Sequence, residues 1–400
     1  MKKAWRVLTT GFTVLALVLV SMGIGRFSAK SSEADQVKVG FIYDGDAATP
    51  YSANFMRAEE ALKNELGDRV TVIPIRNVSE ADSEAHIRSL AEAGCDIIFT
   101  TSYGYEETAK SLAHEYPDVE FCQATGDNAN TDPVLPNYHT FMGEIYEGRY
   151  ISGVLAGMKL HEMISAGTIS AEEAVVGYVA AFPYAEVISG YTAFFLGVRS
   201  VVPDAVMKVK YSNTWSGYAV EYQLAKELIE EGCVLISQHS DTIGPAVACE
   251  EAHGQGKTVI HVGYNTSMES VAPATSLVSC RINWNPYILA AVKAVMNNEK
   301  LEAAVPGHVH GNDVGAGFER DWVQLLNIND AVAAKGSDAR ARELIDQFRN
   351  GGIEVFKGPY TGVNPYDETD TIDLSGGFQE NADRSAPAFA YVLDDVIEIE

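Results

Sequence analysis

Aromatic, acidic and amide side chains recur in this sequence directly after its apolar segments. The candidates that share this position are Asp44, Tyr51, Asn54, Phe55, Tyr103, Tyr105, Tyr184, Glu186, Trp215, Asp241, Tyr264 and Asn265. In open parallel α/β sheets, ligands bind beyond the carboxyl ends of the strands, where loops meet the starts of helices. Opposed rings with carboxylate and amide groups nearby suit a flat heterocycle that is stacked between the rings and hydrogen-bonded at its edges. The pattern therefore predicts a binding site for an aromatic ligand.

The loop after the first apolar segment argues against a phosphate group on that ligand. Its sequence, "YDGDAATPYSAN" (43–54), contains neither G-x-G-x-x-G nor G-x-x-x-x-G-K-[ST]. It also places two acids where backbone amides would need to face an anion. Dinucleotide binding is therefore disfavoured.

Motifs for catalysis or metal binding are missing from the sequence. It has no G-x-S-x-G elbow and no H-E-x-x-H, and its nine histidines are scattered. The most metal-like stretch is "HVHGNDVG" (308–315), but strand alternation explains it equally as an exposed face. We predict that the protein is not an enzyme and holds no metal and no cofactor.

The five cysteines also lack metal-binding spacing. They stand singly, without C-x-x-C, at Cys95, Cys122, Cys233, Cys249 and Cys280. Their apolar neighbours favour buried free thiols that pack as small hydrophobic side chains. If one pair is bridged, Cys95 and Cys122 are the best placed, because they lie in or next to successive predicted strands.

The charge balance excludes another class of partner. The 400 residues carry 55 acidic and 29 basic side chains, for a net charge of -26. Such a surface repels nucleic acid and anionic lipid, because neutralising phosphates needs clustered cations. We therefore predict no nucleic-acid partner.

The first thirty residues have the pattern of an export segment. Lys2, Lys3 and Arg6 precede a run over 7–25 that has no ionisable side chain. That run is close to the ~20 residues that span a bilayer, so 1–30 is either a cleaved signal peptide or an N-terminal membrane anchor. We expect 31–36 to be a linker, and the folded part to lie at the outer face of the cytoplasmic membrane or in the periplasm.

Beyond the linker, β-branched runs alternate with amphipathic helical windows, which predicts parallel sheets with crossover helices. The expected strands of the first lobe are 37–43, 70–78, 96–102, 119–125 and 138–145. After a polar stretch at 165–173 that begins like a capped helix, those of the second lobe are 174–182, 205–211, 234–240 and 258–265, and 276–284 then runs into a crossover that returns to the first lobe. We therefore predict an α/β protein of two doubly wound lobes joined by a multi-strand hinge. The first lobe is 37–165, with 285–330 returning to it, the second is 166–284, and 331–400 forms a C-terminal helix and wrap.

Several short stretches together resemble one family. "VGFIY", "FTTSYGY", "GRYISGVLAG", "PYAEVISGYTAFFLGVRSVVP", "SQHSDT", "VGYNTSM" and "INWNPYI" are similar to the basic membrane protein family of ABC-transporter substrate-binding proteins, which includes purine nucleoside receptor lipoproteins. The resemblance covers about 37–356. It implies a type I periplasmic-binding-protein fold, no catalysis, and delivery of a purine base or purine nucleoside to a membrane permease. We also expect the protein to act as a monomer.

The sequence departs from the family pattern in two places. Many members carry a D-x-S-F-N-like or G-W-T-Y-like segment after the first strand, whereas this chain has "TPYSANF", which leaves Tyr51 or Phe55 as the stacking candidate. The family's lipid-anchoring cysteine is also missing before Cys95.

Other functions remain open beside uptake of a purine. The protein could present the same ligand to a membrane sensor, or bind another small aromatic or sugar-like solute. A nucleoside hydrolase would need an activating base or a metal that no motif supplies. A sugar-responsive repressor would need DNA-binding helices where the export segment stands.

Overall fold

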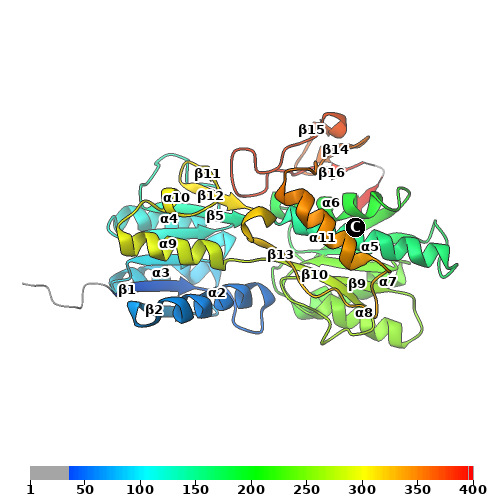
Figure 1. Cartoon of the computed structure of the whole chain (residues 1–400), viewed down its shortest axis with the longest axis horizontal. Coiled ribbons are helices and arrows are strands. Elements are labelled where there is room, and N and C mark those ends of the chain that lie inside the picture. The colour runs from blue at the N-terminus through cyan, green and yellow to red at the C-terminus, as the bar shows by residue number, and fades with distance from the viewer. Residues whose placement is uncertain (1–35, 395, 400) are drawn as a thin grey trace, which may run out of the picture. The chain divides into compact units, whose positions relative to one another are not determined.

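The β-branched segments of the sequence form two largely parallel seven-stranded sheets (Figure 1). The computed structural model describes residues 36–394 and 396–399, and both sheets lie within one unit, Val37–Glu400. The first sheet, in spatial order, is β11 (His308–His310), β12 (Asp313–Ala316), β5 (Tyr138–Gly143), β4 (Glu120–Ala124), β3 (Ile97–Thr100), β1 (Val37–Ile42) and β2 (Val70–Ile75). The second is β13 (Val323–Leu325), β10 (Ser276–Ile282), β9 (Ile260–Tyr264), β8 (Leu235–His239), β6 (Val175–Ala180), β7 (Val206–Tyr211) and β17 (Ile397–Ile399). The predicted class, two doubly wound α/β lobes, is confirmed.

Helices cover both faces of the first sheet, which with them forms the first lobe. α2 (Pro50–Leu66) packs against α9 (Asn285–Asn297) on one face, while the other face carries α3 (Ser83–Glu92) and α4 (Glu106–Glu115). Strands that are buried on both faces have near-continuous apolar sequences. β3, with the sequence "IIFT", is an example, because all four of its residues are buried.

The second sheet is covered in the same way and forms the second lobe. α5 (Tyr146–Ser165) and α6 (Ala185–Arg199) pack against each other, and so do α7 (Tyr218–Glu230) and α8 (Gly244–Gly254). Glycines let α5 and α6 approach backbone to backbone: a Cβ on Gly153 would lie 1.9 Å from the carbonyl oxygen of Phe194, and one on Gly197 would lie 2.2 Å from that of Tyr150. Any larger residue would push these helices apart.

Two segments belong to a different lobe from the one expected. α5 falls in the predicted first lobe (37–165), but it packs on α6 and β10 of the second lobe. β13 falls in the predicted return to the first lobe (285–330), yet it pairs antiparallel with β10. In both cases the sequence shows an apolar face without showing which sheet that face covers. The polar stretch at 165–173 forms turns and no helix beyond Ser165.

Three chain crossings join the lobes side by side. The chain leaves the first sheet after Gly143, returns after Ile282 and leaves again after Ala316. A Cβ on Gly143 would lie 2.8 Å from the Ile282 side chain and 3.1 Å from the carbonyl oxygen of Trp322, so the crossings are in direct contact. This is the multi-strand hinge that the alternating pattern predicts.

The C-terminal part lies against both lobes. α11 (Ser337–Arg349) packs on α5, and β14 (Thr361–Asn364), β15 (Asp367–Asp373) and β16 (Val392–Leu393) form a small third sheet. The buried carboxylate of Glu380 accepts a hydrogen bond from Ser189 Oγ of α6 (2.6 Å). Five residues later, Ser385 Oγ donates to Asp313 Oδ1 of β12 (2.6 Å). The segment 380–385 therefore bridges the two lobes.

The remaining expectations concern thiols and membrane segments. All five cysteines are buried, and Cys95 and Cys122 are free thiols and not bridged to each other, as the free-thiol prediction expects. The predicted export segment (1–30) and the linker up to residue 35 lie outside the described residues. In the part that is described, none of the helices has both the length and the apolar character required to traverse a bilayer.

Candidate functional site

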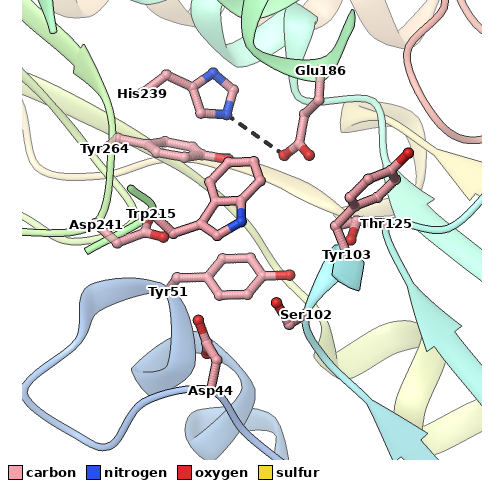
Figure 2. A pocket seen from close by; sticks show the side chains of 10 residues that line it. All are labelled: Asp44, Tyr51, Ser102, Tyr103, Thr125, Glu186, Trp215, His239, Asp241 and Tyr264. Carbon is pink, nitrogen blue, oxygen red and sulfur yellow. Dashed lines mark ion pairs between the residues drawn. The ribbon is translucent and has the colours of Figure 1, made fainter. Parts of the chain in front are cut away.

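A narrow pocket lies where strand ends of both sheets meet, with about 370 Å³ of space that no atom fills, counting the part that is open to solvent. Figure 2 shows the side chains that line it: Asp44, Tyr51, Ser102, Tyr103, Thr125, Glu186, Trp215, His239, Asp241 and Tyr264. Seven of these ten are among the residues singled out in the sequence. Ser102, Thr125 and His239 are additional.

The first-lobe wall comes from the loops after β1, β3 and β4 and from the start of α2. Its polar groups are bonded within that lobe: Tyr51 Oη donates to the carbonyl of Thr101 (2.6 Å), Ser102 Oγ to Glu80 (2.7 Å), Thr125 Oγ1 to the carbonyl of Ala124 (2.6 Å), and Ser52 Oγ to Asp44 (2.8 Å). Thr125 also has a positive φ of 62°, which is strained for a β-branched residue. This wall is fixed in position by its own lobe.

The second-lobe wall carries most of the aromatic surface. Trp215, in the loop after β7, packs edge-on against Phe182, with ring centroids 5.1 Å apart, and lies 6.0 Å from Tyr184. Tyr264 ends β9, and its ring lies over the guanidinium of Arg149, whose Cζ is 3.6 Å from the ring centroid. This arrangement is a cation–π contact in a buried setting.

The loops that carry Trp215 and Asp241 are held together behind the pocket. The Asp241 amide donates to the carbonyl of Trp215 (2.8 Å). The buried carboxylate of Glu221 in α7 accepts from Gly217 N, Ser240 Oγ and Thr242 Oγ1, at 2.8, 2.8 and 2.6 Å. One buried acid therefore orders both loops, and a rigid support of this kind fixes the geometry of a binding site.

Arg149 of α5 is a buried cation that the sequence gave no reason to select. Its Nη1 donates to the carbonyl of Gln238 (2.8 Å), while Nε and Nη2 have no hydrogen-bond partner. It lies behind Tyr264 and does not line the pocket. Because an arginine remains charged when buried, its field acts on the second-lobe wall.

The pocket lining has an acidic character and includes no lysine or arginine. Burial raises the pKa of Asp44. Burial, and then the negative charges of Asp44 and Glu221, raise the pKa of Asp241 well above its usual value. Burial and the positive charge of Arg149 lower the pKa of His239 to about 4, so its imidazole is neutral at pH 7. The lining therefore combines three carboxyl groups with a neutral imidazole and includes no cationic side chain.

Two predicted stacking or lining residues lie in the core instead. Phe55 is fully buried and stacks on Trp284, with ring centroids 4.3 Å apart. Tyr105 is also buried, and its hydroxyl donates to the carbonyl of Val78 (2.6 Å). Both follow strand ends, but their helical positions turn them toward the first sheet. Tyr51, one helical turn before Phe55, is the stacking candidate that does line the pocket.

The other three predicted residues lie next to the pocket. Asn54 Nδ2 donates to Asn265 Oδ1 (3.1 Å), and Asn265 Nδ2 donates to Asp241 Oδ1 (2.9 Å), so the two amides connect the lobes behind the lining. Tyr184 is 41% exposed, and its ring lies 5.7 Å from that of Tyr103 across the two lobes.

The metal-like stretch does not form one cluster. His308 Nδ1 lies 2.6 Å from Glu144 Oε1, which raises the pKa of His308 to about 9. Asp313 is instead bonded to Thr140 and Ser385. The carboxylates of Glu144, Glu147 and Glu319 come within 4.8 Å of one another, in an arrangement that acidic groups often adopt without an ion.

With this geometry established, the chain can be compared with known proteins. The profile of the family described as "ABC transporter substrate-binding protein PnrA-like" matches residues 36–332. A purine-binding protein of Brucella abortus is 32% identical over 332 residues, which cover 81% of this chain and 84% of that protein. A putative ABC transporter glucose-binding protein of Haloferax volcanii is 34% identical over 283 residues, 70% of this chain and 64% of that protein.

Solved structures share the fold at low sequence identity. An ABC transporter solute-binding protein from Aeropyrum pernix superposes with a TM-score of 0.64 and 16% identity, covering 83% of this chain and 95% of that one. One from Conexibacter woesei gives a TM-score of 0.61 and 18% identity, covering 79% and 97%. These likenesses concern the fold alone.

Proposed function

This chain belongs to the PnrA-like family of ABC transporter substrate-binding proteins, and on that premise we propose that its ligand is a purine nucleoside or a purine base. Proteins of this family and fold bind small molecules outside the cytoplasm for a membrane permease and are not enzymes. The proposal concerns the chemical class of the ligand and the side chains that hold it.

The composition of the pocket lining carries the proposal. Four aromatic rings and three carboxylates, from both lobes, line a space that no lysine or arginine enters. The rings offer flat apolar faces, each worth on the order of 1 kcal/mol in stacking beyond simple burial. The carboxylates, when ionised, only accept hydrogen bonds, so they suit the N–H and O–H donors of a base or a ribose.

The same lining disfavours a nucleotide. At 4 Å, two like charges repel each other by about 4 kcal/mol in the dielectric typical of a protein surface. A phosphate beside Asp44, Glu186 or Asp241 would meet this repulsion without a cation to offset it. The purine-binding relative from Brucella abortus supports the same ligand class.

A sugar is the second candidate. The Haloferax volcanii relative is named as a glucose-binding protein. Aromatic faces and carboxylates also suit the apolar faces and hydroxyl groups of a sugar. A sugar offers no aromatic ring to stack, so it would use the carboxylates more than the four aromatic side chains.

We propose that the ligand contacts come from seven predicted residues: Asp44, Tyr51, Tyr103, Glu186, Trp215, Asp241 and Tyr264. Asn54, Asn265 and Tyr184 support them from behind or at the edge, while Phe55 and Tyr105 stabilise the first lobe. Delivery to a permease for uptake is the proposed role, with presentation of the ligand to a membrane sensor as its alternative. Action as a monomer, and export by the N-terminal segment with or without cleavage, remain predictions.

A thermal-shift screen and native mass spectrometry test the ligand class. The panel is hypoxanthine, adenine, inosine, adenosine, inosine monophosphate and D-glucose. A ligand at 100 times its dissociation constant stabilises the protein by about 2.7 kcal/mol. We expect a raised melting temperature with a base or nucleoside, none with the nucleotide, and recovery of the ligand unchanged. A shift with D-glucose alone would overturn the proposal.

A further inference from the structure

His239 is a buried histidine whose hydrogen-bonding capacity is unused. It ends β8, is 2% exposed and lines the pocket. Neither of its ring nitrogens has a hydrogen-bond partner. A buried polar group without a partner costs free energy, because it has lost its hydrogen bonds to water. An unpaired group that faces a binding pocket is therefore expected to bond to the ligand.

The two nitrogens of this ring face different surroundings. A Cβ on Gly190 would lie 2.6 Å from Nδ1, so that nitrogen faces the backbone of α6 and is shielded from the pocket. Nε2 faces Glu186, as Figure 2 shows. It lies 3.6 Å from Oε1 of that carboxylate. This distance is too long for a hydrogen bond. Nε2 and the carboxylate are neighbours, but they do not satisfy each other.

The surrounding charges determine which nitrogen carries the proton. The ring is neutral at pH 7, because burial and the charge of Arg149 hold the pKa of His239 at about 4. A neutral imidazole has one N–H donor and one acceptor nitrogen. The carboxylate of Glu186 favours the proton on Nε2, and Nδ1 has no acceptor beside it. Nε2–H therefore points toward the carboxylate side of the pocket.

We propose that His239 and Glu186 act as a pair that determines specificity: Nε2–H of His239 donates to the ligand, and the Glu186 carboxylate accepts from the adjacent ligand atom. The ligand class is a heteroaromatic ring that carries an acceptor next to a donor on one edge. A 6-oxopurine has O6 beside N1–H, and a 6-aminopurine has a ring nitrogen beside its amino group. This inference rests on the proposed purine ligand and names the edge by which that ligand is recognised.

Arg149 supports the pair from behind. Its guanidinium lies under the ring of Tyr264, which in turn contacts the ring of His239 with centroids 4.9 Å apart. Replacing Gly190 by any larger residue would displace His239, because the added side chain would collide with the imidazole. Arg149 and Gly190 are thus positioning residues that keep His239 neutral and oriented.

Two substitutions at one position separate a ligand contact from a packing role. His239→Gln retains an N–H donor near the position of Nε2, whereas His239→Met fills the space without a donor. By calorimetry with hypoxanthine and adenine, we expect His239→Gln to bind within about threefold of the wild type and His239→Met to bind at least about tenfold more weakly. Ser237→Ala, which removes a buried hydroxyl from the same strand away from the pocket, is the matched control and should leave the affinity unchanged.

Ligand analogues provide a readout that packing alone would not change. 1-Methylhypoxanthine lacks the N1–H donor, and N6,N6-dimethyladenine lacks the amino donors. The wild type should discriminate against both, because each lacks the donor that faces the Glu186 carboxylate, and Glu186→Met should lose most of that discrimination. Discrimination retained in full by Glu186→Met, or equal weakening of purine binding by His239→Gln and His239→Met, would overturn the inference.

A measurement on the wild-type protein covers the case in which the Met variant does not fold. In ¹⁵N-histidine NMR at pH 7, His239 should be the neutral Nε2–H tautomer, and saturating hypoxanthine should shift its Nε2 resonance. A protonated ring, an Nδ1–H tautomer or an unmoved resonance would contradict the inference.

The wild-type panel keeps the two proposals distinguishable. If purines bind and the His239 tests fail, only the pair is overturned. If D-glucose alone binds, the purine proposal fails, and the Gln and Met variants titrated with D-glucose then test the Nε2–H contact by itself. If neither purines nor D-glucose binds, both proposals are overturned.

Discussion

The two walls of the pocket use their polar groups in opposite ways. On the first-lobe wall, the hydroxyls of Tyr51, Ser102 and Thr125 already donate to acceptors of their own lobe. On the second-lobe wall, His239 has both nitrogens unpaired, and Glu186 has only the 3.6 Å contact to it among the described residues. An unpaired buried group gains most from a new hydrogen bond. The first wall therefore determines the shape of the pocket, and the second wall determines which ligand it selects.

The largest expected effect tests the aromatic part of this contrast. We expect Trp215→Ala on the second wall to weaken purine binding by about 2–4 kcal/mol, roughly 30-fold to several hundred-fold, because a large ring is lost from the centre of the site. Trp284→Ala is the matched change in the first lobe, where the ring is buried against Phe55. It should instead lower the unfolding free energy by about 3–5 kcal/mol. Calorimetry and thermal melts of ligand-free protein measure both, and affinity retained in Trp215→Ala would break the comparison.

The two lobes also differ in the charge of a buried histidine within each sheet. In the first lobe, burial lowers the pKa of His139, but the hydrogen bonds that its ring donates to the carboxylates of Glu120 and Glu302 outweigh this and raise the pKa to about 9. In the second lobe, burial lowers the pKa of His261 to about 3. The first lobe thus keeps a buried imidazole charged between acids, and the second keeps one neutral.

His139 should therefore stabilise the fold in a pH-dependent way. Its folded pKa lies above the ordinary value near 6.5, so the contribution is complete below pH 6.5 and is lost as the pH rises through 9. We expect His139→Gln to cost about 3 kcal/mol at pH 6 and clearly less at pH 9.5. Denaturant unfolding of the wild type and of His139→Gln at the two pH values measures this. If the difference in unfolding free energy is as large at pH 9.5 as at pH 6, His139 is not charged in the folded protein.

A smaller effect compares the two aspartates of the pocket, the buried Asp241 and the half-buried Asp44. Asp241→Asn should weaken purine binding by about 1.5–3 kcal/mol, or roughly tenfold to hundredfold, because a carboxyl oxygen that accepts from the ligand is lost from a buried setting. Each aspartate already accepts one bond, from Asn265 and from Ser52, so their difference in burial decides, and Asp44→Asn should cost less, about threefold. Each substitution keeps the shape of the side chain, so the ligand-free melting temperatures should stay close to the wild type. Equal losses in affinity would remove the distinction between the walls.

The smallest expected effect is on the first wall. Tyr51→Phe removes only the bond to the carbonyl of Thr101 and should lower the unfolding free energy by about 1 kcal/mol. The ring that stacks is retained, so purine affinity should change by less than about threefold. A tenfold loss of affinity would show that the hydroxyl reaches the ligand, against its assignment to the fold.

Much of the fold was predictable because strand and helix periods differ. Alternating apolar segments identified both sheets, and the rule that ligands lie beyond strand ends identified seven of the lining residues. The choice between Tyr51 and Phe55 was not predictable, because it depends on how α2 is rotated against its sheet. Arg149 was missed for a related reason: its helix packs on the second lobe, and the sequence does not show which sheet an apolar helix covers.

His239 was within reach of sequence reasoning but was not selected. It stands at the end of a predicted strand, as the other candidates do, and a single buried histidine is ordinarily a core residue. Only its surroundings in the folded protein, with two unpaired nitrogens beside Glu186, distinguish it from His261, whose Nε2 is bonded to Gln238. Pairing and burial are properties of the folded neighbourhood, so one sequence does not reveal them.

The bridge at 380–385 has a mechanical consequence. Five peptide units separate Glu380, held by α6, from Ser385, held by β12, and a fully extended chain of that length spans at most about 18 Å. While both hydrogen bonds remain, the two lobes can separate at that edge only until the segment 380–385 is fully extended. This segment lies beyond the residues 36–332 that match the family model, so the limit on opening comes from the C-terminal part of the chain.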